Sequence, residues 1–134
     1  MEILIAITIV SLLGTVTAVV LIQQIPRARV SKATMEIGNI KTALNLYYAD
    51  NGNFPTPQQG LEALITKPAT PPVPENYLPG GYLDNLKVPL DPWGNPYVYL
   101  IPGSGGEAFE IISYGADGEP GGDGFNADIS SSKQ

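Results

Sequence analysis

The longest apolar run of the chain lies at its start. Residues 3–22 carry no charged side chain over twenty positions, and Glu2 stands directly before them. Twenty helical residues rise about 30 Å, which matches the hydrocarbon core of a bilayer. The pattern therefore predicts a membrane-spanning helix over residues 1–25. The small and hydroxylated residues within the run are typical of helices that also pack against other helices in lipid.

A cleaved signal peptide is the main alternative for this run. Signal peptides begin with basic residues and end at a small-residue cleavage site, whereas here the first charge is Glu2 and residues 23–26 read Gln-Gln-Ile-Pro. A helix buried in a soluble core is disfavoured as well, because the run has no polar face. We therefore expect the chain to be anchored through a single span.

Helical periodicity continues after the apolar run, over residues 26–53. Apolar side chains recur every three or four positions, which predicts an amphipathic helix buried through Val30, Ala33, Ile37, Ile40, Leu44 and Tyr47. Pro26 has no backbone donor, so a kink or local melting is expected near Gln23. The run Asp50-Asn51-Gly52-Asn53 is typical of a helix end.

Residues 54–134 have the composition of a small head domain. Eleven of the thirteen prolines lie between Pro55 and Pro102, and most of this segment is therefore expected to be irregular, apart from a helical turn or two within residues 59–65. A disordered linker would lack large apolar residues at regular intervals. We expect an ordered loop anchored by Leu61, Leu64, Tyr77, Leu78, Tyr82 and Leu86.

Two segments near the C-terminus have the composition of β-strands. Residues 97–101 and 108–113 are separated by Pro102-Gly-Ser-Gly-Gly, a sequence that favours a hairpin. An acidic, glycine-rich loop follows Ser113. The predicted fold class is α+β, with a long N-terminal helix packed on a small antiparallel sheet.

Composition limits the possible functions. The chain has 134 residues, of which some 80 remain for the head, so one small domain is the limit. The net charge is −6 and the carboxylates crowd the last third, which disfavours nucleic-acid binding. The absence of cysteine and histidine from the sequence removes disulfides, thiol chemistry and the commonest general base. An enzyme is therefore the least expected function.

The glycine-rich loop is the best candidate for a binding site. Asp117, Asp123, Asn126 and Asp128 offer hard oxygen donors within twelve residues, and the glycines between them allow backbone carbonyls to turn inward. Calcium prefers such an all-oxygen set. The spacing is not that of an EF-hand. The alternative is an acidic turn that binds only water.

Five segments together resemble the major pseudopilins of type II secretion systems. They are Met1-Glu-Ile-Leu-Ile, Tyr47-Tyr-Ala-Asp-Asn-Gly-Asn-Phe-Pro-Thr, Gln59-Gly-Leu-Glu-Ala-Leu, Asp91-Pro-Trp-Gly-Asn-Pro-Tyr and Ser113-Tyr-Gly-Ala-Asp-Gly. The last two are the more specific, because ordinary type IV pilins do not carry them. Members of this family begin about three residues earlier, after a short leader, so we expect that this sequence starts truncated or from an internal methionine.

The resemblance implies a function and a set of site residues. The subunit would be stored in the bacterial inner membrane with its head in the periplasm, and would polymerise into a helical filament that drives protein export. Its partners would be copies of itself, minor pseudopilins, the inner-membrane assembly platform and, before assembly, lipid. Glu2 would pair with the N-terminal ammonium of a neighbouring subunit. Calcium would be held by the side chains of Asp117 and Asp128 and the carbonyl of Tyr114, with Asp123, Asn126 and Gly122 as further candidates.

Two other functions are compatible with the sequence. One is a true type IV pilin or related surface filament, which the two specific motifs argue against. The other is a membrane-anchored, calcium-dependent binding module that stays monomeric. Within the Asp91–Tyr97 motif, Trp93 is expected to be a largely buried plug that holds the loop on the sheet, with a carbohydrate-binding platform as the alternative.

Overall fold

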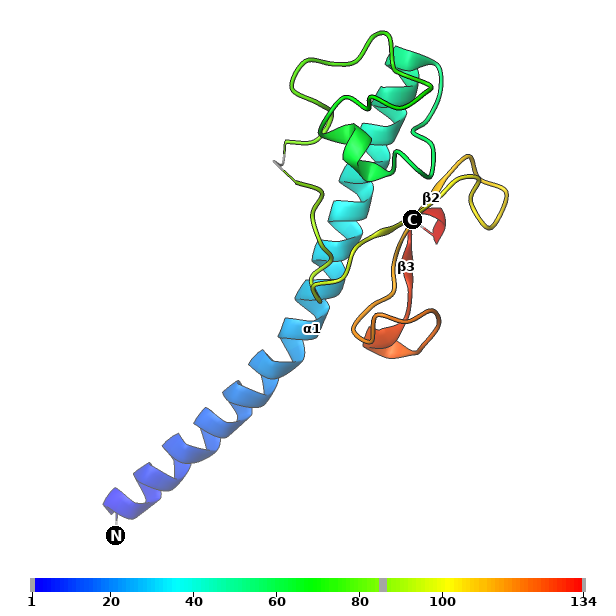
Figure 1. Ribbon diagram of the computed structural model, residues 1–134. Coiled ribbons are helices and arrows are strands. Elements are labelled where there is room, and N and C mark those ends of the chain that lie inside the picture. The colour runs from blue at the N-terminus through cyan, green and yellow to red at the C-terminus, as the bar shows by residue number, and fades with distance from the viewer. Residues whose placement is uncertain (1, 85–86, 134) are drawn as a thin grey trace.

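The computed structural model describes residues 2–84 and 87–133, and the side chains of residues 2–26, Phe125 and Lys133 lie outside this description. Helix α1, Glu2–Asn51, is one continuous α-helix of 50 residues. Its C-terminal half lies against the head and its N-terminal half extends away from it (Figure 1). The helix passes through Pro26 without interruption, so local melting near Gln23, one of the two expected effects of this proline, is wrong, and the kink stays a prediction. A proline removes one backbone hydrogen bond, and the turns on either side keep theirs.

The membrane-span prediction for residues 3–22 falls on side chains that lie outside the description. Among the residues that are fully described, no helix is long and apolar enough to cross a bilayer.

The end of α1 is confirmed where the sequence indicates it. Gly52 adopts a φ of 78°, a left-handed conformation that residues with a Cβ rarely take. Its N–H donates to the carbonyl of Tyr48 at 2.7 Å, which satisfies one of the last free carbonyls of the helix. The chain then turns back along the helix, and Phe54 stacks on Tyr48 with ring centroids 4.6 Å apart.

A small antiparallel sheet forms the second layer of the head. Strand β1, Val98–Leu100, pairs with β2, Glu110–Ser113, and β2 pairs with β3, Ile129–Ser130, so the spatial order is β1-β2-β3. The predicted hairpin is confirmed, with Val98 opposite Ile112 and Leu100 opposite Glu110. The third strand was not predicted, because two residues are too few to show an alternating pattern.

The apolar core lies between α1 and the rest of the head, and it confirms the predicted face of the helix. The helix positions with the least exposure follow the expected three- and four-residue spacing; they are Ala33, Ile37, Ile40, Leu44 and Tyr47. Leu64 and Ile111 close the core from the loop and the sheet. The Tyr47 ring lies 5.4 Å from that of Tyr82 and 6.3 Å from that of Tyr77, centroid to centroid.

Hydrogen bonds from Gln59 hold the start of the proline-rich segment. Thr56 and Gln59 exchange bonds between each side chain and the other's N–H, at 3.0 and 3.1 Å, in the manner of a capping box. The Gln59 Nε2 group also donates to the carbonyls of Thr70 and Pro72. A single 3₁₀ turn, η1 at Leu61–Leu64, follows. The polar bonds of Gln59 therefore connect two parts of a segment that cannot form regular structure.

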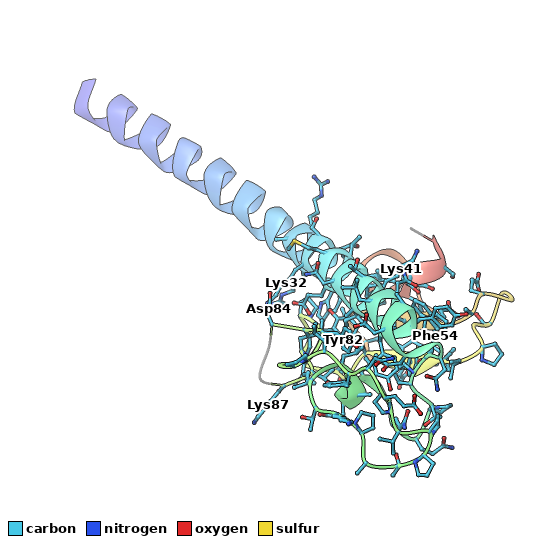
Figure 2. All side chains as sticks on the ribbon, turned by 90° about the horizontal axis from the view of Figure 1, so that it is seen from above. Lys32, Lys41, Phe54, Tyr82, Asp84 and Lys87 are labelled. Carbon is cyan, nitrogen blue, oxygen red and sulfur yellow. The ribbon has the colours of Figure 1, made fainter. Side chains whose placement is uncertain are left out.

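Tyr82 connects the middle of the same segment to the end of α1 (Figure 2). Its hydroxyl donates to Asp50 at 2.8 Å and accepts from the Asn51 side chain and the Leu78 N–H at 3.2 Å each. The Leu78 side chain is 43% exposed, so its expected role as an apolar anchor is wrong, and its N–H makes the contact instead. Leu86, another expected anchor, lies outside the described residues.

Candidate functional site: the acidic loop and its supports

The acidic loop, residues 114–128, leaves the sheet at the end of β2 and returns at the start of β3. These strands are antiparallel neighbours, with Ser113 opposite Ile129, so the two ends of the loop lie side by side. The loop projects from the sheet beside α1 (Figure 1), and its only regular element among the described residues is the 3₁₀ turn η2, Gly124–Asn126. The β2–β3 pairing therefore fixes both ends of the candidate site.

Two glycines allow the loop to fold back on itself. A Cβ on Gly122 would meet the Asn126 carbonyl oxygen at 2.6 Å, and one on Gly115 would meet the Ala127 carbonyl oxygen at 2.8 Å. Both glycines also have positive φ, 101° and 79°. Any side chain at either position would displace the backbone, so the close approach of these carbonyls depends on glycine.

The predicted ligands are only partly brought together. The Gly121 N–H donates to both carboxylate oxygens of Asp128 at 3.1 Å, which places Asp128 against the same turn as Gly122 and Asn126. Asp117 accepts the N–H of Glu119 at 3.2 Å, within a turn of its own. The side chains of Asp117, Asp123 and Asn126 are exposed, and Tyr114 and Asp128 are half-buried.

The donor chemistry of the loop fits a hard cation. Among the described residues, no three His, Cys, Asp or Glu side chains gather as a metal cluster. The set implied by the resemblance relies instead on two main carboxylates together with carbonyl and amide oxygens. The carbonyl oxygens of Asn126 and Ala127 lie close to glycines, which is compatible with that set. The Asp128 carboxylate accepts one N–H and keeps lone pairs for a cation.

Asp91 supports the loop from outside, a role that the sequence analysis missed. This carboxylate is 4% exposed. Its Oδ1 accepts the N–H groups of Trp93 at 3.1 Å and Asn95 at 2.8 Å, and its Oδ2 accepts the hydroxyl of Ser113 at 2.8 Å. An Asp before proline and glycine is typical of such a turn, so the pattern could have indicated the first two bonds. The bond to Ser113 joins residues 22 apart in the sequence, so no local sequence pattern predicts it.

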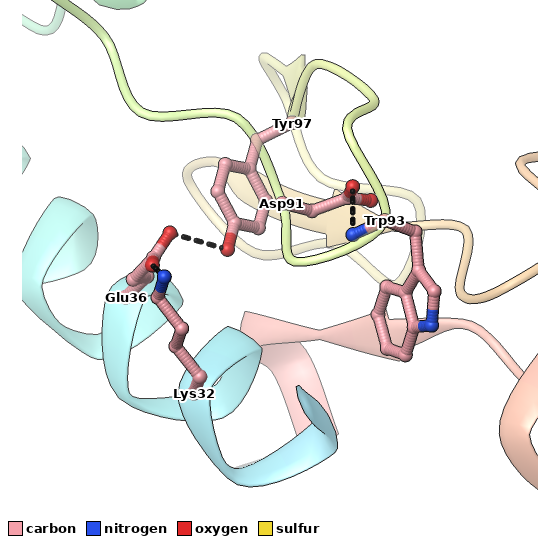
Figure 3. Close-up of polar contacts among 5 residues, drawn as sticks. All are labelled: Lys32, Glu36, Asp91, Trp93 and Tyr97. Atoms are coloured by element: carbon pink, nitrogen blue, oxygen red, sulfur yellow. Dashed lines mark hydrogen bonds and ion pairs between the residues drawn. The ribbon is translucent and has the colours of Figure 1, made fainter. Parts of the chain in front are cut away.

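Trp93 does not have the predicted role. Its side chain is partly buried and lies outside the apolar core cluster. Figure 3 shows the indole pointing away from Tyr97 and Glu36, while the Trp93 N–H points to Asp91. Trp93 is therefore not a plug in the apolar core, although much of its side chain is covered. The motif is held on the sheet by the Asp91 carboxylate, because a buried charge needs several donors and takes them from the turn around it.

Tyr97 connects the same motif to α1. Its hydroxyl donates to Glu36 at 2.8 Å, and Glu36 also pairs with Lys32 at 3.7 Å (Figure 3). Burial, and secondly the Glu36 carboxylate, raise the pKa of Tyr97 well above its usual value. The phenol therefore stays protonated and keeps donating to the helix.

Glu110 is the second buried carboxylate near the loop, and the sequence analysis missed it too. It is 4% exposed within β2. Its Oε1 accepts the N–H and hydroxyl of Ser104, and its Oε2 accepts the hydroxyls of Ser130 and Ser132. These bonds, first those of Ser104 and then that of Ser130, lower the pKa of Glu110 to about 2. An acidic residue inside an apolar strand, with a serine run at the C-terminus, was the available indication.

Comparisons with known proteins agree on one family. Residues 20–132 match the family model described as "Type II secretion system (T2SS), protein G". The chain is 47% identical over 124 residues to the type II secretion system core protein G of Pseudomonas aeruginosa, covering 90% of this chain and 85% of that protein. It is 43% identical over 129 residues to the core protein G of Vibrio cholerae, covering 96% and 86%.

A solved structure agrees with these sequence matches. The crystal structure of the major pseudopilin from the type 2 secretion system of enterohaemorrhagic Escherichia coli is similar, with a TM-score of 0.70 and 34% identity. The match covers 85% of this chain and 95% of that one.

Proposed function

The chain belongs to the protein G family of type II secretion systems and is a pseudopilin, a pilin-like structural subunit, and we propose that it assembles with copies of itself through α1. The family consists of structural subunits of the cell envelope. Within the envelope, we place the apolar half of α1 in the inner membrane before assembly and the head in the periplasm. Minor pseudopilins and an inner-membrane assembly platform are the further partners in this proposal.

The shape of the molecule supports assembly through the helix. The N-terminal half of α1 extends beyond the head (Figure 1), and its sequence carries no charge between Glu2 and Arg27. Such a surface is stable in lipid or against other apolar helices, and unstable in water. Helices that leave the membrane therefore need one another, whereas the head is closed around its own core. This asymmetry is the observation that carries the proposal.

Glu2 provides the test of assembly. A carboxylate in lipid costs several kcal/mol unless it is paired, so pairing with a neighbour's N-terminus would favour ordered addition of subunits. In a secretion system that lacks its own major pseudopilin, Glu2→Ala should insert into the membrane and yield few filaments by electron microscopy. Glu2→Asp keeps the charge and serves as the control. Filaments of normal number from Glu2→Ala would remove Glu2 from the mechanism.

We also propose that the acidic loop binds calcium. Asp117 and Asp128 would supply side-chain oxygens and Tyr114 a carbonyl, with Asp123, Asn126 and the Gly122 region completing the set. The ion would neutralise a loop in which four carboxylates lie within twelve residues. An ion at a hundred times its Kd stabilises the folded state by about 2.7 kcal/mol, because it binds that state alone.

Calorimetry on the full chain in detergent tests this site. Calcium should raise the melting temperature, magnesium should have a smaller effect, and Asp117→Ala should abolish the response. Glu119→Ala removes a carboxylate from the same loop outside the proposed ligand set, so it should retain the response. Equal shifts of the melting temperature with calcium and magnesium would show that the ions act by charge screening. An equal loss of the calcium response in Asp117→Ala and Glu119→Ala would show the same.

A further inference from the structure

The acidic loop has a buried carboxylate beside each of its ends, and neither belongs to the proposed ligand set. Asp91 lies beside the start of the loop and Glu110 beside its end. Both side chains are 4% exposed, and within the described part of the chain neither forms an ion pair. A buried charge without a counter-ion is stable only if hydrogen-bond donors surround it. The donors it recruits are thereby fixed in place.

At the start of the loop, Asp91 acts through Ser113. The Ser113 hydroxyl donates to Asp91 at 2.8 Å and accepts the N–H of Gly115 at 3.3 Å, so the first turn of the loop is tied to the carboxylate. A second contact lies further along, where a Cβ on Gly118 would meet the Asn95 amide nitrogen at 2.9 Å. Asn95 is itself positioned by its N–H bond to Asp91.

At the end of the loop, Glu110 acts through two serines. The Ser130 hydroxyl in β3 and the Ser132 hydroxyl both donate to Glu110 Oε2, and the Ser132 N–H donates back to Ser130 at 3.1 Å. The segment after the loop is therefore held against β2 by side chains as well as by the short β2–β3 ladder. Two paired residues alone form a weak ladder, so the Glu110 carboxylate and the Ser131 hydroxyl, which accepts the Ile111 N–H at 2.9 Å, add to the attachment at this end.

We propose that Asp91 and Glu110 are positioning residues that hold the acidic loop in its folded shape from both ends before any ion binds. Neither touches the proposed cation; each acts through serine hydroxyls on the strands that flank the loop. The claim about the ion-free shape stands on these contacts alone, and its consequence for calcium affinity rests on the proposed function. Groups that orient metal ligands without touching the metal commonly change affinity about 10–100-fold when they are removed.

Single-hydroxyl variants of the full chain in detergent provide the experiment. Ser113→Ala and Ser130→Ala each remove one donor to a buried carboxylate and leave the carboxylates and the ligand set intact. Tyr97→Phe and Tyr99→Phe are matched controls, since each removes one hydroxyl bond whose acceptor, Glu36 or Pro55, lies outside the loop and is neither Asp91 nor Glu110. Each variant is digested in chelator with a protease that cleaves after acidic residues, and is titrated with calcium by calorimetry.

The proposal predicts that both serine variants are cut within residues 117–128 at least threefold faster than wild type without ion, and that their Kd for calcium rises about tenfold. The tyrosine controls should match wild type in both measurements. Unchanged cutting and unchanged Kd in the serine variants would overturn the proposal. If wild type binds no calcium, the proposal of a metal site is wrong. The rate of cutting in chelator then tests by itself whether Asp91 and Glu110 hold the loop in its folded shape.

Discussion

The head is stabilised in two different ways in its two halves. Between α1 and the proline-rich segment, the buried contacts are mostly apolar and aromatic, with Ile37, Leu44 and Tyr47 fully buried. Around the acidic loop, buried carboxylates and serines, among them Asp91 and Glu110, lie beside the apolar residues of β2. Apolar burial is non-directional and tolerates small shifts, whereas a hydrogen-bonded carboxylate requires each donor at a defined position.

The difference has a functional consequence. The apolar half must hold the head on a helix that also belongs to the assembly, and burial suits that purpose because it does not depend on pH or ions. The polar half must shape a loop of glycines and acids that has little apolar surface of its own. Directional bonds to buried charges achieve this with few residues. The two halves should therefore respond differently to truncation, to acid and to loss of single hydrogen bonds.

Truncation of the apolar half should have the largest effect. Tyr47→Ala removes a fully buried ring in contact with Tyr77 and Tyr82, and should lower the free energy of unfolding by about 3–5 kcal/mol. Denaturant titration of the full chain in detergent measures this loss. It should be the same at pH 7 and pH 3, since no charge is removed. A loss of unfolding free energy that differs between pH 7 and pH 3 would show that the stability of the apolar half depends on the carboxylates of the polar half.

The polar half should respond to acid through Glu110. Its pKa in the folded state, about 2, lies below its ordinary value of 4.5, so it contributes stability above pH 4.5 and loses it as pH falls toward 2. Glu110→Gln should therefore cost about 1–3 kcal/mol at pH 7 and almost nothing near pH 2. Melting temperatures of wild type and variant across this range test the claim. A constant difference between them would contradict it.

Trp93 should matter less than its size suggests. The indole is only partly buried and lies outside the core cluster, so Trp93→Ala should cost about 1–2 kcal/mol rather than the larger loss typical of a buried tryptophan. Asp91→Ala in the same turn is the comparison, and should cost more because three donors lose their acceptor. Thermal melting of both variants measures the two losses. A greater loss of stability for Trp93→Ala than for Asp91→Ala would support the interpretation of Trp93 as a buried plug.

The contact between the motif and α1 should have the smallest effect. Tyr97→Phe removes the hydroxyl bond to Glu36, which keeps its pairing with Lys32, so a loss of about 1 kcal/mol is expected. Calcium affinity should not change, because the bond lies on the α1 side of the head. A large loss of stability would mean that the motif is held by the helix rather than by Asp91.

The two halves also differ in how far their sequence predicts them. The helix face from Ala33 to Tyr47, the helix end at Gly52 and the β1–β2 hairpin follow from periodicity and turn residues, which act over a few positions. The roles of Asp91 and Glu110 depend on partners 22 and 20 residues away that no local pattern connects. Trp93 was misjudged for the same reason, because burial of an aromatic residue in an irregular loop is decided by tertiary contacts.

Amide hydrogen exchange of Glu110→Gln at pH 7, compared with wild type in the full chain, tests whether the buried carboxylates stabilise the acidic loop separately from the apolar core. We expect faster exchange at residues 102–107 and 114–132, where Ser104, Ser130 and Ser132 lose a charged acceptor. Exchange at residues 37–47 of α1 should stay as in wild type. Equal acceleration in both regions, or none near the acidic loop, would show that Glu110 does not stabilise the acidic loop separately from the apolar core.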